Sequence, residues 1–234
     1  MIYAAVLAGG IGSRMQNTDL PKQFLELGDK PILLHTVEKM LMNSRIDRVY
    51  IGINPDWQTY CEDLVRKYLG TEERLTVVPG GKDRNGTIIN VIAAIEAEFG
   101  LGEEDVIITH DAVRPFVTQR ILDDNIDAAL ACGACDTVVK ASDTIVRSED
   151  GDVITEIPPR DPLYQGQTPQ SFNLKMLKSC FEEMTDEERA ILTDACKLCV
   201  LKGKPVKLVQ GEVLNFKITT VGDYQLARAM LMMK

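Results

Sequence analysis

The sequence has little that would place it in a membrane or outside the cell. No apolar run approaches the ~20 residues that a membrane-spanning helix needs. Residues 1–8 are apolar, but no basic segment precedes them and a glycine loop follows at once. They therefore indicate a buried first strand rather than a signal peptide. We expect a cytoplasmic protein with no membrane partner.

Positive charge is also scarce. The chain has 26 Lys and Arg residues against 35 Asp and Glu residues, and its formal net charge is −9. This balance argues against an extended nucleic-acid surface, which needs many cations to neutralise phosphates. An acidic protein that binds phosphorylated ligands must concentrate its cations locally, so the position of each Lys and Arg is informative.

Patterns of metal ligands are few. Two C-x-x-C pairs occur, Cys132/Cys135 and Cys196/Cys199, and these residue types at that spacing suggest zinc. The first pair lies where a helical pattern gives way to a strand, and the second lies inside an apolar helical stretch. Buried thiols in a reducing compartment explain both pairs better. The two histidines have no companions at metal-ligand spacing and are interpreted as structural.

The order of strand and helix patterns predicts the fold class. In a chain of 234 residues, apolar strand-like runs alternate with amphipathic helical stretches. Such alternation is typical of a Rossmann-like α/β domain, with a mainly parallel sheet covered by helices on both faces. In these sheets ligands bind at the carboxyl ends of the strands. The expected strands are Ile2–Leu7, Arg48–Ile53, Leu75–Val78, Val106–Thr109 and Thr137–Lys140. The expected helices between them are Ile32–Met42, Trp57–Leu69, Thr87–Phe99 and Gln119–Ala131.

The alternation is interrupted between about residues 143 and 167. Two short strand patterns around a Ser-Glu-Asp-Gly-Asp turn predict a β-arm inserted into a single domain of residues 1–234. An arm of this size has no core of its own and commonly packs on a second subunit, so we expect a homodimer. The remaining expected elements are helices at Leu174–Met184 and Thr193–Lys202, a strand at Val206–Gln210 and a helix from Val221 onward.

A glycine loop follows the first expected strand, in the run Leu7-Ala8-Gly9-Gly10-Ile11-Gly12-Ser13-Arg14-Met15. Glycines allow backbone N–H groups to approach phosphate oxygens, and Arg14 and nearby Lys22 can neutralise their charge. The loop lacks the Gly-Lys-Ser/Thr of a Walker A motif and the third glycine of a dinucleotide fingerprint. A nucleotide-dependent oxidoreductase is therefore a poor explanation. A plain strand–helix turn and a non-catalytic nucleotide-binding protein remain open.

Several motifs together resemble one enzyme family. The run Ala-Gly-Gly-x-Gly-x-Arg-Met followed by Pro-Lys-Gln-Phe looks like the nucleotidyltransferases that make nucleotide-activated sugars and polyols. Three further groups of segments match the same pattern in the same order, which extends the resemblance over residues 4–223. They are Gly80–Thr87, then His110–Pro115, and last Gln167–Gln170 with Thr193–Ala195 and Asn215–Thr219.

The resemblance implies a CTP-dependent cytidylyltransferase that acts on a polyol phosphate, releases pyrophosphate and uses Mg²⁺ or another divalent cation. The family includes methylerythritol-phosphate and ribitol-5-phosphate enzymes. Here the first loop reads Ala-Gly-Gly, Val113 stands in the acidic motif and the later motif reads Thr-Asp-Ala-Cys-Lys. Methylerythritol enzymes typically show Ala-Ala-Gly, Asp-Ala-Ala-Arg and Thr-Asp-Asp. We therefore favour ribitol 5-phosphate, with CDP-ribitol used for teichoic acid or capsule precursors. The alternative is 2-C-methyl-D-erythritol 4-phosphate in isoprenoid synthesis.

The resemblance also implies roles for individual residues. Arg14 and Lys22 are the expected catalytic cations, because a phosphate nucleophile needs charge neutralisation and positioning rather than a base. Asp111 is expected to face the metal or the polyol hydroxyls, although capping or pairing with Arg114 would also explain it. The expected nucleotide-binding residues are Leu7, Ala8, Gly9, Gly10, Gly12, Gly81, Arg84, Thr87 and Ala112. The other expected ligands of the acceptor are Arg160, Thr193 and Lys217.

Overall fold

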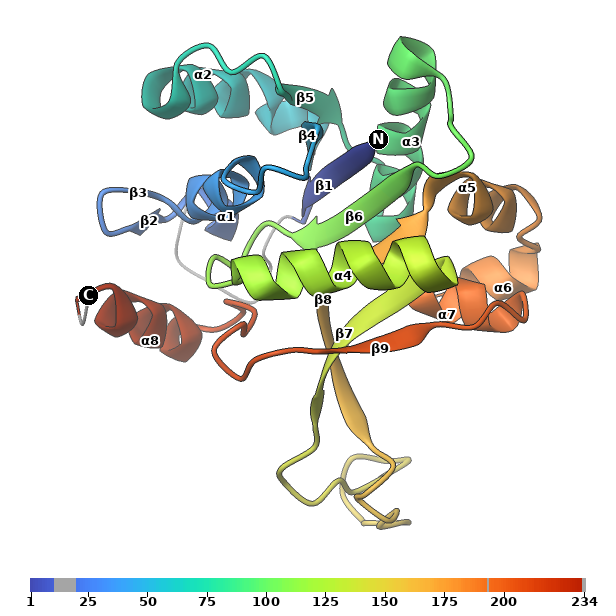
Figure 1. The fold of residues 1–234 in the computed structure, drawn as a ribbon. Coiled ribbons are helices and arrows are strands. Elements are labelled where there is room, and N and C mark those ends of the chain that lie inside the picture. Colours follow the sequence, from blue (N-terminus) through green and yellow to red (C-terminus); the bar gives the residue numbers. More distant parts are fainter. Residues whose placement is uncertain (11–19, 193, 233–234) are drawn as a thin grey trace.

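The computed structural model describes residues 1–10, 20–192 and 194–232. A seven-stranded sheet with the strand order β5-β4-β1-β6-β8-β7-β9 forms the centre of the fold (Figure 1). Neighbouring strands pair in parallel except for β8, which is antiparallel to both of its neighbours. The strands are β1 (Ile2–Ala8), β4 (Arg48–Ile53), β5 (Leu75–Pro79), β6 (Val106–Asp111), β7 (Ala134–Lys140), β8 (Tyr164–Asn173) and β9 (Lys207–Gln210).

Helices cover both faces of this sheet, as the sequence predicts. One apolar cluster packs α1 (Ile32–Leu41), α2 (Gln58–Leu69) and α4 (Gln119–Cys132) on the first face. A second cluster packs three helices on the opposite face, namely α3 (Arg84–Phe99), α5 (Leu174–Glu182) and α7 (Ala195–Leu201). The remaining helices are α6 (Asp186–Ile191) and α8 (Val221–Met232), with one-turn helices at Lys22–Phe24 and Pro55–Trp57 and a small hairpin of β2 (Glu26–Leu27) and β3 (Lys30–Pro31). Within the described ranges, no helix has the length and apolar character that a bilayer crossing requires.

Short polar side chains fix where several helices begin. Asp83 accepts a hydrogen bond from the backbone N–H of Gly86 at the start of α3. Asp194 accepts one from the N–H of Lys197 at the start of α7. Each cap satisfies a backbone donor that has no partner inside its helix, a contribution of typically ~1 kcal/mol. The start of α3 lies in the same cavity wall as the carboxyl ends of the parallel strands.

Two elements differ from the sequence expectation. The ten-residue strand β8 was not predicted, because its Gln, Gly, Thr, Pro and Ser residues have little intrinsic preference for strands. Pairing with β6 on one side and β7 on the other stabilises it instead. Helix α6 was also missed, although Thr185 and Glu188 form a capping box at its start. The other expected strands and helices are present with small differences at their ends.

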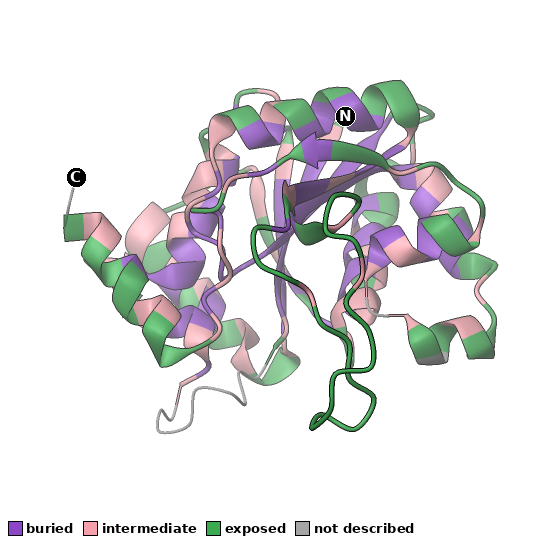
Figure 2. Ribbon diagram, turned by 90° about the horizontal axis from the view of Figure 1, so that it is seen from below, coloured by how far each residue is buried: buried purple, intermediate pink, exposed green. Residues whose placement is uncertain are grey.

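The segment between β7 and β8 projects from the body of the protein as an arm (Figures 1 and 2). The expected pair of short strands is wrong in detail, since the only bridge in the described arm joins Arg147 and Glu156. The physical reason is exposure. Val153, Ile154 and Ile157 are 55–60% exposed, so the described part of the chain gives them too little packing to stabilise regular strands.

Candidate active site

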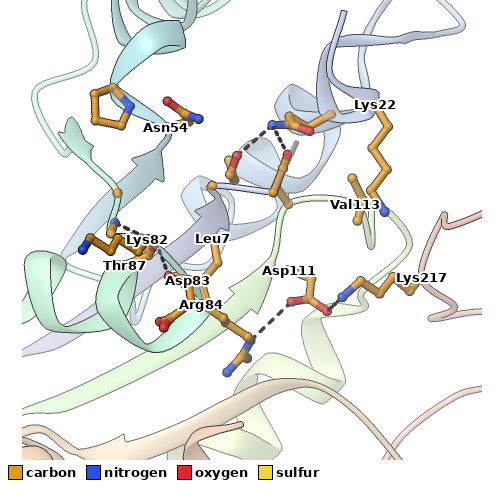
Figure 3. Close-up of a pocket in the computed structure, with 18 residues that line it drawn as sticks. Leu7, Lys22, Asn54, Lys82, Asp83, Arg84, Thr87, Asp111, Val113 and Lys217 are labelled. Atoms are coloured by element: carbon orange, nitrogen blue, oxygen red, sulfur yellow. Dashed lines mark hydrogen bonds and ion pairs between the residues drawn. The ribbon is translucent and has the colours of Figure 1, made fainter. Parts of the chain in front are cut away.

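A cavity of about 710 Å³ opens at the carboxyl ends of the parallel strands (Figure 3). Its wall comes from the segments that follow β1, β4, β5 and β6, together with the side chains of Lys22 and Lys217. This is the edge where parallel α/β sheets bind ligands. The charged side chains in the wall include Lys22, Lys82, Arg84 and Lys217, so the scarce cations are concentrated here.

The loop after β5 brings backbone atoms into close contact. The N–H of Gly81 donates to the Thr87 hydroxyl at 3.1 Å, and that hydroxyl donates to the carbonyl oxygen of Asp83 at 2.9 Å. A Cβ on Gly81 would lie 2.4 Å from the carbonyl carbon of Gly86, so only glycine fits this turn. Thr87 is therefore not the cap of α3, which is Asp83. Its side chain instead holds the loop in shape.

Ala8 and Gly10, at and just beyond the end of β1, are held by a residue that sequence reasoning missed. The buried amide of Gln23 donates to the carbonyl oxygens of Ala8 at 2.7 Å and Gly10 at 3.1 Å. Gln23 lies in the same one-turn helix as Lys22, whose ammonium group donates to the carbonyl oxygen of Ile218 at 3.1 Å. These bonds connect Ala8 and Gly10 through the one-turn helix to the segment that contains Ile218. The motif Pro-Lys-Gln-Phe contained the signal, because a buried Gln needs hydrogen-bond partners.

Asp111 lies at the end of β6 between three cations. Its Oδ2 is 3.0 Å from Lys217 Nζ, and its Oδ1 is 3.6 Å from Arg84 Nε (Figure 3). The same Oδ2 is 3.3 Å from Arg114 Nε. Burial alone would raise the pKa of Asp111, but the three cations together hold it far below its usual range. The carboxylate therefore stays ionised and orients Lys217 and Arg84 rather than accepting protons.

Comparison with known proteins agrees with this geometry. A model of the 2-C-methyl-D-erythritol 4-phosphate cytidylyltransferase family matches residues 2–233. This chain belongs to that family. It is therefore a CTP-dependent cytidylyltransferase, as the motifs of the sequence implied.

Solved structures share the architecture of the family. The 4-diphosphocytidyl-2C-methyl-D-erythritol synthase of Anaerococcus prevotii is 28% identical, with a TM-score of 0.79 over 99% of this chain and 96% of that one. The 2-C-methyl-D-erythritol 4-phosphate cytidylyltransferase of Francisella tularensis is 24% identical, with a TM-score of 0.82 over 97% of this chain and 98% of that one. These matches confirm the predicted nucleotidyltransferase fold with its mainly parallel sheet.

Within this cytidylyltransferase, Arg114 connects the acidic strand end to the segment that presents Lys217. Its Nη1 donates to the carbonyl oxygen of Asn215 at 2.8 Å while its Nε faces Asp111. The neighbouring His110 is fully buried between the Thr168 hydroxyl and the carbonyl oxygen of Arg114. Burial lowers the pKa of His110 to about 4, so the ring is neutral at physiological pH. Both residues are structural, in agreement with the sequence interpretation.

The cytidylyltransferase cavity brings together most of the residues predicted for it. Its wall contains Leu7, Ala8, Gly9, Gly10, Lys22, Gly81, Arg84, Thr87, Asp111, Ala112 and Lys217. Gly12, Arg14 and Thr193 lie outside the described residues. Arg160 does not join the wall. It is exposed on the arm, where its Nη1 donates to the carbonyl oxygen of Ser142 at 2.8 Å.

The residues present do not form a metal site centred on Asp111. A divalent cation there would have to displace Lys217 and lie beside Arg84 and Arg114, so like charges would oppose it. No group of three or more His, Cys, Asp or Glu side chains in the described ranges is arranged to hold a metal ion. The expectation that Asp111 faces a metal ion therefore has no support from this geometry.

Proposed function

We propose that this enzyme transfers the cytidylyl group of CTP to ribitol 5-phosphate, giving CDP-ribitol and pyrophosphate. The cytidylyl transfer follows from the family, and the identity of the acceptor is what we propose. One side chain of the cavity wall gives the most direct support for ribitol 5-phosphate as that acceptor. Val113 is 6% exposed and lines the cavity next to Asp111, in the same wall as Lys22 and Lys217 (Figure 3).

Val113 stands where methylerythritol enzymes typically have alanine. Methylerythritol has a methyl branch on C2 that ribitol lacks, so its enzymes need space near the acceptor that an alanine leaves open. Val113 packs with Leu27, Ile32 and Ile218 beside the cavity, and we infer that its larger side chain leaves less of that space. Closely packed sites respond to differences of a single methyl group. Ala195 is a second difference, because it replaces the second Asp of Thr-Asp-Asp. It is fully buried in the apolar cluster around α7 and offers no polar group to a ligand.

The second candidate acceptor is 2-C-methyl-D-erythritol 4-phosphate. The comparisons favour it over ribitol 5-phosphate, because the matching family and the solved structures described above are all named for methylerythritol chemistry. The two acceptors share a phosphate monoester and a hydroxylated carbon chain. The chemistry of transfer is therefore the same for both.

In the reaction, an oxygen of the acceptor phosphate forms a bond to the α-phosphorus of CTP, and the bond from that phosphorus to the bridging oxygen of pyrophosphate breaks. The acceptor oxygen is already anionic, so the site needs no general base. Lys22 and Lys217 supply positive charge at the cavity wall, where charge develops on the phosphates. Asp111 holds Lys217 at 3.0 Å and so fixes one of these charges in place.

Members of this family generally use a divalent cation. Since Asp111 is already paired with cations, we infer that Mg²⁺ enters on the phosphate oxygens of CTP, its usual ligands in nucleotide enzymes. When bound, it neutralises phosphate charge and helps the leaving group depart. The backbone of the glycine loop and Lys22 then hold the triphosphate.

The acceptor can be tested by measuring pyrophosphate release with CTP and Mg²⁺ against both polyol phosphates in parallel. We expect kcat/KM for ribitol 5-phosphate to exceed that for methylerythritol 4-phosphate by at least ~10-fold, the discrimination that one or two misfitted methyl groups produce. Val113→Ala should narrow the ratio by admitting the branched acceptor. A higher kcat/KM for methylerythritol 4-phosphate in the unmodified enzyme would overturn the proposed acceptor and favour the second candidate.

The nucleotide preference gives a separate prediction. We expect roughly 10²-fold higher kcat/KM with CTP than with UTP, because an enclosed site that hydrogen-bonds one base rejects an analogue that leaves its polar groups unpaired. Cytosine offers an amino donor where uracil has an oxygen, and the backbone around Gly80 and Gly81 lines the cavity, where its carbonyl oxygens and N–H groups could contact the base. ATP and GTP should be turned over more slowly still. Equal turnover of all four nucleotides would contradict the role of this loop.

We also propose that the enzyme is a homodimer assembled through its arm. The exposed apolar side chains of the arm need a packing partner, and a second copy of the same chain is the commonest one. In such a dimer Arg160 would complete the active site of the partner subunit. This would explain why the position of Arg160 matches an acceptor-binding position of the family although Arg160 lies outside the cavity wall of its own chain.

A further inference from the structure

A second group of polar side chains lies on the α3 and α7 face of the sheet, beyond Asp111. Gln170 of β8 is in register with Thr109 of β6 and with Asp136 of β7. Paired residues project from the same face of a sheet, so these three side chains form one row across three strands. From ordinary strand spacings, Asp136 lies on the order of 12 Å from Asp111, Cα to Cα. The Arg84 side chain extends into this interval from the start of α3.

Polar atoms in this region are buried without hydrogen-bond partners. Nη1 and Nη2 of Arg84 have none, although Nε of the same side chain faces Asp111. Gln170 is only 3% exposed. Its Nε2 donates a hydrogen bond to Oδ1 of Asp136 at 3.1 Å, and its Oε1 has no partner. Buried polar atoms are normally satisfied, and each exception calls for a ligand or another explanation. Two donor nitrogens of Arg84 and one acceptor oxygen of Gln170 are therefore buried without a hydrogen-bond partner.

The charges around these atoms determine what kind of group fits. Burial raises the pKa of Asp136 and nearby Asp194 raises it further, whereas the hydrogen bond from Gln170 and the guanidinium groups of Arg84 and Arg114 lower it. A phosphate would be repelled by the two carboxylates, and a cation would be repelled by the guanidinium. A hydroxyl group satisfies both, because it donates to a carboxylate or amide oxygen and accepts from a guanidinium nitrogen. The site thus selects an uncharged hydroxylated group.

Asp111 is poorly suited to the same task. Its two oxygens already face Lys217, Arg114 and Arg84, so a hydroxyl would have to compete with three cations for them. Asp136 accepts a hydrogen bond from Gln170 at Oδ1, and Gly166 adds no side chain beside Oδ2. Asp136 is therefore the better acceptor for a hydroxyl.

We propose that Asp136, together with Gln170 and Arg84, binds hydroxyl groups in the carbon chain of the acceptor. This inference rests on the proposed function only in requiring a polyol phosphate, and it holds for either candidate acceptor. The acceptor phosphate then lies near Lys22 and Lys217, and its carbon chain extends past Asp111 towards β7. Asp136 is a specificity residue for the hydroxylated part of the substrate.

The test compares Asp136→Asn with the unmodified enzyme. Asn keeps the size of the side chain and an oxygen for Gln170, but it loses the charge that strengthens a hydrogen bond to a hydroxyl. We expect the KM of the acceptor to rise about 10-fold, the usual effect of losing a hydrogen bond to a charged group, while the KM of CTP stays within twofold. Asp127→Asn is the matched control, because it removes the same charge from α4 on the opposite face, where Asp127 pairs with Arg45.

Asp136→Asn is not expected to destabilise the fold, so a change in the acceptor KM can be attributed to binding. Burial raises the pKa of Asp136 to about 6, which means that its charged form disfavours the folded state at neutral pH. A neutral Asn should therefore leave the melting temperature unchanged or slightly higher. Titration of ribitol 5-phosphate into the enzyme without CTP, followed by calorimetry, gives a binding measurement that does not depend on turnover.

The outcomes separate this inference from the proposed function. If the enzyme prefers methylerythritol 4-phosphate, the acceptor proposal is wrong, but the KM for that polyol phosphate should still rise in Asp136→Asn. An acceptor KM within twofold of the unmodified enzyme would overturn the role of Asp136. So would an equal rise in the KM values of CTP and acceptor, or a melting temperature lowered by several degrees, since either would indicate that Asp136 only maintains the fold.

Discussion

Lys22→Ala is expected to lower kcat by ~10²–10³-fold, the usual effect of removing one preorganised charge stabiliser. Lys22 lies in the cavity wall, and its one-turn helix is fixed to the glycine loop by Gln23. A phosphate nucleophile is already anionic and needs no base, so we expect stabilisation of phosphate charge to contribute most of the catalysis. Arg14→Ala should have an effect of the same size if its predicted catalytic role is correct.

Stability should change much less than activity. Lys22 donates a hydrogen bond to the carbonyl oxygen of Ile218 and lies close enough to Asp223 to lower the pKa of that carboxyl, and an average hydrogen bond contributes ~1 kcal/mol to folding. For a protein of this size, that loss lowers the melting temperature by about 2–4 °C. Lys30→Ala is the matched control, because Lys30 pairs with Glu38 outside the cavity wall. Turnover by Lys22→Ala within threefold of the unmodified enzyme would refute the catalytic role.

The sequence predicted the fold well where hydrophobic patterns are strong. The buried strands β1, β4 and β6 were found because their apolar runs end at turn residues or at a polar motif. Strand β8 could not be found this way, since its polar residues become a strand only by pairing with β6 and β7. The arm was located correctly but not its internal structure. The conformation of an exposed segment depends on the surface it packs against. If that surface belongs to another chain, the sequence of one chain does not reveal it.

The candidate site shows the same division. Motifs located the cavity residues, because glycines and cations at the ends of strands have few other uses. They did not show that Asp111 is paired with Lys217, Arg84 and Arg114, since these residues are far apart in the chain and only the fold brings them together. Asp136 was missed for a related reason. A single Asp inside an apolar strand has no local pattern, and its importance depends on unpaired atoms contributed by α3 and β8.

Mixing two impaired variants should restore activity if the arm completes the site of the partner subunit. Arg160→Ala and Lys22→Ala are each expected to have low activity. In a heterodimer of the two, one site receives both substitutions and the other site receives neither. With free exchange of subunits at equal concentrations, about a quarter of all sites should be intact, because half of the dimers are mixed and each has one complete site.

The arrangement of the arm motivates this expectation. Arg160 lies in the arm, whose apolar residues Val153 and Ile157 are more than half exposed in the single chain. Arg147→Ala is the matched control, since Arg147 is also a cation of the arm but pairs with Glu149 and Glu156 of the same arm. It should be nearly as active as the unmodified enzyme. Heterodimers that form without recovered activity would place Arg160 in the site of its own subunit. A sedimentation mass of one chain would exclude the dimer itself, because two arms can share a surface only when two chains associate.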